Sequence, residues 1–184
     1  MPHYIAFLRG MNLGNRRIKM DELRAHCESL KLRNVSTFIA SGNVIFESTH
    51  QNGQQLSARL QAHLEKSLGY AVDTFVRTRA EVAAVAAFRP FPDALIENPA
   101  HTLYVGFWHE APTPALARGL VACRTPVDEF CVHGREYFWL CRIKSSESEV
   151  WASPALRALK LPSATMRNIT TVRKLANFYP PLLA

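Results

Sequence analysis

Apolar positions in the first half of the chain follow two patterns: short runs, and stripes that recur every three or four residues. Such runs are typical of strands in a sheet, and such stripes are typical of helices with one buried face. The predicted strands are 4–8, 35–40, 44–46 and 72–76, and the predicted helices are 20–30 and 54–68. In chain order these elements predict a ferredoxin-like βαββαβ unit, with helices on one face of a four-stranded sheet.

The residues between the second and third predicted strands indicate a tight hairpin. Gly42-Asn43, with glycine first, suits a two-residue type II′ turn. In that register Ser41 lies opposite Val44. A serine beside a turn glycine is typical of turn chemistry, and the strand-to-helix turn that a nucleophile elbow requires is not predicted here.

A similar pattern begins again near residue 101, after a short alanine-rich helix at 79–88. The predicted elements of this part are a strand at 101–108, a helix at 114–122, a hairpin over 128–142 around Gly134-Arg135, a helix around 148–159 and a C-terminal helix with Thr165 as its N-cap. A final strand is not evident from the pattern.

The repeated pattern predicts an α+β fold of two ferredoxin-like (βαββαβ) halves with antiparallel sheets, the second half incomplete or decorated. The first half is expected at 1–88 and the second, with the C-terminal helix, at 101–184. Three prolines within 89–100 indicate a connection between them. The two hairpins should occupy equivalent places in the two halves.

The chain of 184 residues has a net charge of +7, concentrated near its ends. Residues 1–20 contain four basic residues and residues 150–184 contain five, with no acidic residue in either segment. A basic surface of this kind fits phosphate groups, nucleic acid or an acidic partner. The alternative is an ordinary solvated surface in a protein of high pI.

The loop after the first strand combines glycines with basic residues and leads into a helix. Free backbone N–H groups and the helix dipole attract anions at such a position. We therefore predict a ligand site from this loop, the first hairpin turn and the C-terminal segment, with Arg9 and Arg167 on the same side of the molecule around one anion. The candidate ligand-binding residues are Arg9, Asn12, Arg16, Arg17, Lys19, Ser41, Asn43, Arg167, Asn168 and Lys174.

Motifs for cofactors and metals are absent from the sequence. Neither the phosphate-binding G-x-x-x-x-G-K-[ST] loop nor G-x-G-x-x-G occurs, and the seven histidines show no metal-binding spacing, so we expect no cofactor and no metal. No catalytic residue can be assigned. Whether the protein is an enzyme, and its oligomeric state, stay open.

The N-terminus lacks a cationic leader and a cleavage site, and the longest apolar run, 82–88, is far shorter than the about 20 residues that span a bilayer. We therefore expect a cytoplasmic protein with no membrane partner. The four cysteines, without C-x-x-C spacing, are expected to be reduced. Cys27 lies on the apolar stripe of the first helix and should be a buried thiol.

Three functions fit these observations. The favoured one is binding of a phosphate-bearing ligand, either nucleic acid or a small phosphorylated, nucleotide-like metabolite, through the basic residues. The others are an enzyme acting on a small anionic substrate in a cleft between the halves, and a protein-interaction domain. An RNA-recognition module is disfavoured, because residues 41–46 keep only one glycine and one phenylalanine of its stacking motif.

Three segments carry a resemblance to a known family: YIAFLRGMNLGNRRIKM at the start, SGNVIFES in the first hairpin and TMRNITTVRKL near the end. Together they resemble the uncharacterised bacterial family catalogued as domain of unknown function 1697, over essentially the whole chain. Asn15, Ile169 and Thr170 depart from the Gly, Trp and Asn of the family pattern. The resemblance implies a duplicated ferredoxin-like architecture, and it implies no activity, substrate or cofactor.

Overall fold

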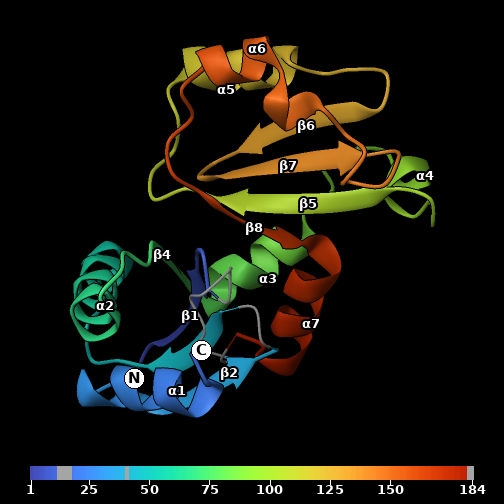
Figure 1. The fold of residues 1–184 in the computed structure, drawn as a ribbon. Coiled ribbons are helices and arrows are strands. Elements are labelled where there is room, and N and C mark those ends of the chain that lie inside the picture. Colours follow the sequence, from blue (N-terminus) through green and yellow to red (C-terminus); the bar gives the residue numbers. More distant parts are fainter. Residues whose placement is uncertain (12–17, 40–41, 182–184) are drawn as a thin grey trace. The chain divides into compact units, whose positions relative to one another are not determined.

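A computed structural model describes residues 1–11, 18–39 and 42–181 (Figure 1). The chain forms two compact units, Met1–Ala84 with Lys174–Ala184, and Val85–Arg173. Each unit contains one four-stranded antiparallel sheet with helices. The predicted α+β fold of two similar ferredoxin-like halves is confirmed.

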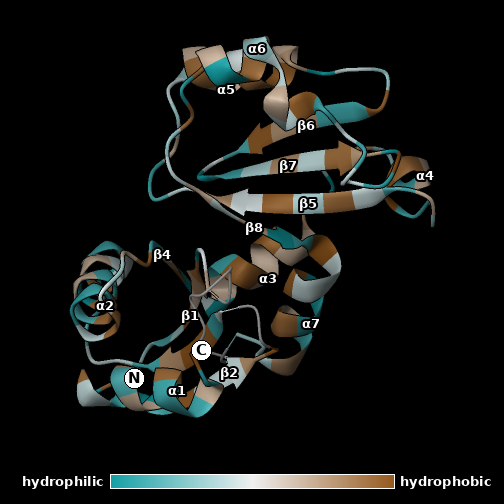
Figure 2. Cartoon of the chain, viewed as in Figure 1, coloured by the Kyte–Doolittle hydropathy of each residue, from teal (hydrophilic) through white to brown (hydrophobic). Residues whose placement is uncertain are grey.

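The sheet of the first unit has the strand order β2-β3-β1-β4, as in a ferredoxin-like sheet. Its elements are β1 (His3–Leu8), α1 (Met20–Ser29), β2 (Arg33–Phe38), β3 (Asn43–Glu47), α2 (Gly53–Leu68) and β4 (Thr74–Thr78). The predicted leucine stripe of α2 is buried in one core cluster with alternate residues of β1 and with Leu23 of α1. In Figure 2, α1 and α2 carry many hydrophilic residues beside their hydrophobic ones, as amphipathic helices should.

Cys27 belongs to this core, as predicted. It is 1% exposed and forms no disulfide. Burial, with a smaller contribution from Glu28, raises the pKa of its thiol to about 12. The thiol therefore stays protonated at neutral pH, where a thiolate would be the reactive form.

The second sheet has the order β6-β7-β5-β8, which repeats the topology of the first. Its strands are β5 (Thr102–Phe107), β6 (Asp128–His133), β7 (Glu136–Cys141) and β8 (Thr165–Asn168), and the helical segments of the second half are α4 (Asp93–Ile96), α5 (Pro114–Ala122), η1 (Val150–Ala152), α6 (Pro154–Ala158) and α7 (Ile169–Phe178). The second half thus has its fourth strand. Thr165, predicted as a helix N-cap, is instead the first residue of that strand, so this prediction was wrong.

The helix predicted around 148–159 is two short pieces, η1 and α6. Ser153 ends the first piece, and its hydroxyl accepts a hydrogen bond from the N–H of Leu156 at 3.3 Å. Pro154 follows in the first turn of α6. A serine N-cap followed by proline starts a new helix, which explains the interruption.

Strand registers match the two halves residue by residue. Ile5 of β1 pairs with Arg77 of β4, and Val105 of β5 pairs with Arg167 of β8. Both arginines lie two residues before a helix, α3 (Arg79–Ala87) in one half and α7 in the other. The hairpins β2–β3 and β6–β7 connect the second and third strands of their units, as predicted.

The first hairpin is longer than predicted. Its strands close at the pair Phe38–Asn43, and Val44 pairs with Thr37, so the expected pairing of Ser41 with Val44 was wrong. Asn43 begins β3 and donates its side-chain amide to the carbonyl of Phe38 at 3.1 Å, which closes the loop. In the second hairpin, His133 pairs with Glu136, so the predicted hairpin around Gly134-Arg135 is confirmed.

Each sheet is also buried on its second face. In the first sheet this is the face opposite α1 and α2, and in the second sheet it is the face opposite α5 and α6. Phe7, Ile45 and Phe75 are fully buried in the first sheet, and so are Phe107 and Phe138 in the second. An RNA-recognition module needs aromatic side chains exposed on its sheet to stack bases. These aromatic side chains are not available for stacking.

The end of α7 packs on the first unit. Phe178 lies 5.7 Å from Phe38 between ring centroids, and the Tyr179 hydroxyl is 3.4 Å from the Ser36 hydroxyl. The guanidinium of Arg79 lies 5.5 Å from the Tyr179 ring. These contacts place Phe178 and Tyr179 with the first unit, whereas the sequence analysis assigned the C-terminal helix to the second half.

Within the described part of the chain, no helix has the length and apolar character needed to cross a membrane.

Candidate functional site

Two of the segments predicted to bind a ligand meet at the end of β1. The N–H of Leu8 donates to the carbonyl of Gly42 at 2.8 Å, and the N–H of Arg9 donates to the carbonyl of Asp73 at 2.8 Å. Met11 is buried and packs close to Gly42. The loop after β1, the β2–β3 turn and the residue before β4 therefore form one packed corner of the first unit.

Arg9 is the charged residue of this corner. Its side chain is 55% exposed, and its Nη1 lies 3.4 Å from Oδ2 of Asp73, which is 27% exposed. An ion pair this exposed contributes only about 0–1 kcal/mol to stability. The carboxylate of Asp73 orients the guanidinium of Arg9 at this corner.

Asn43 has a structural role in this corner. It is fully buried, and its amide donates to the Phe38 carbonyl. The same loop also needs Gly42, whose φ is +73°. Ligand binding at this corner would therefore rest on Arg9 more than on Asn43.

The two helix N-termini of the predicted site differ in charge. In α1, the N–H of Lys19 donates to the Glu22 carboxylate at 3.4 Å, and Asp21 and Glu22 lie in the first turn. In α7 the first turn contains no acid, and the N–H of Thr170 donates to Oδ1 of Asn168 at 2.8 Å. Because acids at an N-terminus already complement the dipole, α7 offers the more favourable end for an added anion.

Arg167 is held along β8. Its Nη1 donates to Oγ1 of Thr165 at 2.8 Å and to the carbonyl of Met166 at 2.9 Å. Burial lowers the pKa of its guanidinium to about 10. The side chain is therefore still charged at neutral pH, although burial makes that charge less favourable. Lys174, farther along α7, is exposed.

The candidate residues divide into groups. Asn12, Arg16, Arg17 and Ser41 lie outside the described residues. Arg9 and the Gly42-Asn43 turn come together at the end of β1, and Arg167 and Asn168 are neighbours on β8. Arg9 belongs to the first unit and Arg167 to the second, and their shared anion site stays a prediction.

Sequence reasoning missed Arg77, the counterpart of Arg167 in the first half. Arg77 is 1% exposed, and its Nη1 donates to the carbonyl of Val76 at 3.0 Å, as Arg167 does to Met166. The signal was an arginine two residues before the helix that follows the fourth strand. It could not be read in the sequence because the short β8 had not been recognised.

The glycine of the first turn allows a test of this corner. A Cβ on Gly42 would lie 2.9 Å from Cγ of Met11 and 3.1 Å from Cβ of Leu8, whereas a Cβ on Gly10 would meet none of the described residues within 4 Å. Both glycines have φ +73°. We expect Gly10→Ala to lower the free energy of unfolding by about 1–2 kcal/mol, the cost of the left-handed backbone alone. Gly42→Ala should cost about 1–3 kcal/mol more, because the core must also shift.

Denaturant unfolding followed by far-ultraviolet circular dichroism measures both free energies. Equal losses for the two variants would mean that Leu8 and Met11 yield without cost, and the packed corner would then be no more rigid than an open loop.

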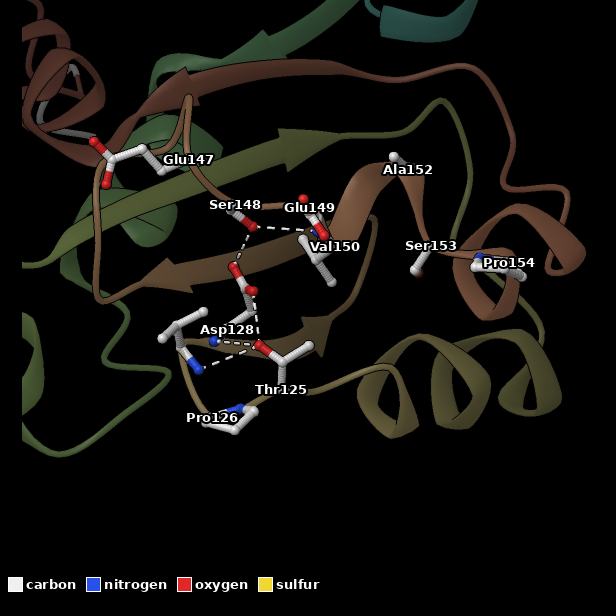
Figure 3. A pocket seen from close by; sticks show the side chains of 11 residues that line it. Thr125, Pro126, Asp128, Glu147, Ser148, Glu149, Val150, Ala152, Ser153 and Pro154 are labelled. Carbon is white, nitrogen blue, oxygen red and sulfur yellow. Dashed lines mark hydrogen bonds between the residues drawn. The ribbon is translucent and has the colours of Figure 1, made fainter.

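A cavity of about 760 Å³ lies in the second unit, beside Asp128 and the segment from Glu147 to Pro154 (Figure 3). Oδ1 of Asp128 accepts hydrogen bonds from Nε1 of Trp139 and Oγ of Ser148, both at 2.8 Å. Its Oδ2 accepts from Oγ1 of Thr125 at 2.8 Å. With acidic residues on its wall and no basic one among those that line it, this cavity is a poor site for a phosphate.

The described residues contain no group of three or more His, Cys, Asp or Glu side chains placed to hold a metal ion.

The model of the family described as Protein of unknown function (DUF1697) matches residues 1–138. The chain belongs to this family. The DUF1697 match includes Arg9, Lys19 and Asn43 and ends within β7, before Arg167.

Among solved structures, the conserved bacterial protein SP0830 from Streptococcus pneumoniae has a similar fold, with a TM-score of 0.74. The two are 19% identical, and the match covers 97% of this chain and 98% of that chain. At this identity, the similarity between the two structures shows only that they share a fold. No curated protein matches the chain.

Proposed function

We propose that the protein binds a phosphate-bearing ligand, either nucleic acid or a nucleotide-like metabolite, through the basic residues of segments 1–20 and 150–184. The observation that carries this proposal is that these segments contain no acid, while Arg9, Lys19 and Lys174 are exposed to solvent. Exposed cations without acids of their own segment attract anions and raise the rate of association with them.

Arg9 supports the proposal through its fixed position. Its backbone N–H is bonded to Asp73, and Asp73 also orients the guanidinium. The planar fork of an arginine suits two parallel hydrogen bonds to phosphate oxygens.

Arg167 supports the proposal through the cost of its burial. Desolvation lowers the pKa of this guanidinium to about 10, so the charge lacks part of the stabilisation that water would give. A phosphate bound beside it would offset that cost. The first turn of α7, without acids, follows two residues later.

Contacts with phosphate fit this molecule better than stacking of bases. The aromatic residues Phe7, Phe75, Phe107 and Phe138, all on strands, are fully buried. Binding of nucleic acid would therefore be governed by charge, with little preference for base sequence and a steep dependence on salt.

The test measures binding of three probes to the full chain: inorganic phosphate, ATP, and a labelled 20-nucleotide single strand. We expect one class of probe to bind, and Arg9→Ala combined with Arg167→Ala to weaken that binding about tenfold. For the oligonucleotide, each lost phosphate contact should also lower the slope of log K against log salt by about 0.7. Fluorescence anisotropy and thermal stabilisation are the measurements.

A control variant removes two other basic side chains. Arg33→Ala combined with Lys66→Ala lowers the charge by two at exposed positions outside both basic segments. If this control weakens binding as much as Arg9→Ala combined with Arg167→Ala, the effect is one of net charge only. If no probe binds, or if both double variants bind as the wild type does, the proposal is wrong.

A further inference from the structure

Strand β6 forms one edge of the second sheet, beside β7 (Figure 1). Within the described residues β7 is its only strand partner. An edge strand leaves the N–H and C=O groups of alternate residues without a partner strand, and these groups can pair with another chain. The six residues of β6 extend over about 20 Å, which suits a partner of about six residues.

A groove of about 720 Å³ runs beside this strand. It is lined by Phe130, Cys131 and Val132 of β6, by one side of α5 and by Pro90-Phe91. Val121 of α5, which is 40% exposed, adds apolar surface to the wall of this groove. The groove therefore offers apolar contacts next to an open sheet edge.

The charge in the groove is positive. Arg118 on α5 and Arg124 just after it are both exposed, and no acid is among the residues that line the groove. Within residues 1–11, 18–39 and 42–181, neither arginine has an ion pair or hydrogen bond from its side chain. Two cations beside an apolar groove complement a ligand that is both apolar and acidic.

We propose that this groove is a docking site for an extended peptide segment of another protein, which adds a strand to the free edge of β6. Main-chain hydrogen bonds to β6 provide affinity. Apolar side chains of the segment occupy the groove against Val121 and Phe91, and acidic side chains meet Arg118 and Arg124. This site lies within the second unit and does not depend on the proposed phosphate binding.

The same charges disfavour a second copy of the chain as the partner. Antiparallel pairing of β6 with its own copy would bring two sets of Arg118 and Arg124 to one interface, and like charges at an interface are unfavourable. A free anionic amphiphile would satisfy the arginines and the apolar wall, but it would not use the main-chain groups of β6. The peptide is the occupant that uses all three features.

The experiment selects ligands from a phage-displayed library of random 12-residue peptides on the immobilised full chain. We expect the selected peptides to carry at least two acidic residues among β-branched or aromatic ones. Synthetic, labelled copies should bind in fluorescence anisotropy, and amide NMR shifts should change at β6 and α5. Arg118→Glu combined with Arg124→Glu should weaken this binding at least tenfold, and peptides with Lys in place of the acids should recover it.

Lys66→Glu combined with Arg157→Glu makes the same change of charge at exposed positions outside the groove and should leave binding unchanged. Circular dichroism checks that both variants are folded. The proposal is overturned if no peptide is selected, if the charge-reversed variant binds equally well, or if the NMR shifts lie away from β6. It is also overturned if the chain self-associates through β6, or if decanoate binds in the groove while no peptide does.

Discussion

Replacing Gly106 by alanine should lower the free energy of unfolding of the second unit by about 3 kcal/mol or more. Gly106 lies in β5 opposite Tyr137 of β7, and the ring of Tyr137 lies across it. A Cβ at this position would be 2.0 Å from Cζ of Tyr137 and 2.5 Å from its hydroxyl oxygen. The ring cannot move away easily, because it is buried and packs against Trp108 at 4.7 Å and Trp151 at 6.0 Å.

Tryptophan fluorescence during denaturant unfolding is the appropriate measurement, because all three tryptophans lie in the second unit. Gly53→Ala is the control for a Gly→Ala change without a clash, and because Gly53 lies in the first unit its unfolding is followed by far-ultraviolet circular dichroism. A Cβ there would have neighbours only at 3.9 Å, and Gly53 is the first residue of α2, so alanine should be neutral or slightly stabilising. A Gly106→Ala variant as stable as this control would show that the ring yields without cost.

The duplication supplies a second check on Gly106. Strand registers make Ala6 and Val44 of the first unit the counterparts of Gly106 and Tyr137. In the first unit, the small side chain of Ala6 lies opposite the medium-sized Val44. In the second unit, Gly106 has no side chain and lies opposite the large ring of Tyr137. Combining Gly106→Ala with Tyr137→Val should therefore be less destabilising than the sum of the two single changes, which a double-mutant cycle measures.

The elements that could be predicted well from the sequence are those whose local helix or strand propensity agrees with their packing in the fold. The helix predicted at 54–68 is an example: it forms α2, and it ends at Gly69, whose φ of +75° suits a glycine. Strand β8 was missed because it is only four residues long and only Thr165 in it is buried. Its short length and polar residues resemble a helix start, and only its pairing with β5 makes it a strand.

The candidate site was less predictable than the fold, because tertiary partners decide what a polar residue does. Arg9 was identified from its neighbours in the sequence. Its ion-pair partner Asp73 could not be identified in this way, because it lies 64 residues later in the chain. The sequence predicts Asn43 as a ligand-binding residue, yet the fold buries it completely. Burial also sets the pKa of Arg167, and the sequence gives no sign of this.

Asp128→Ala should lower the free energy of unfolding of the second unit by about 3 kcal/mol. The change removes the acceptor of three side-chain hydrogen bonds, from Trp139, Ser148 and Thr125. Ser148 and Thr125 are only partly buried and can turn to water. Trp139 is 2% exposed, so its N–H would be left without an acceptor inside the core.

Asp128→Asn should have a smaller effect, about 1–2 kcal/mol, for a reason specific to Thr125. Its hydroxyl oxygen already accepts hydrogen bonds from the N–H groups of Val127 at 3.2 Å and Asp128 at 3.0 Å, so its own proton has to be donated. An amide NH₂ facing this hydroxyl places two donors together, and the opposite amide orientation places the NH₂ against the N–H of Trp139. Neither orientation reproduces the carboxylate.

Glu149→Gln is the control for both Asp128 variants, because Glu149 lines the same cavity, is exposed and should tolerate the change within about 0.5 kcal/mol. Tryptophan fluorescence during denaturant unfolding should therefore give the order Asp128→Ala, Asp128→Asn, Glu149→Gln from least to most stable. If Asp128→Ala unfolds at the same denaturant concentration as Glu149→Gln, the buried carboxylate does not hold the wall of this cavity. The hydrogen bonds of Trp139, Ser148 and Thr125 would then contribute no more than bonds to water.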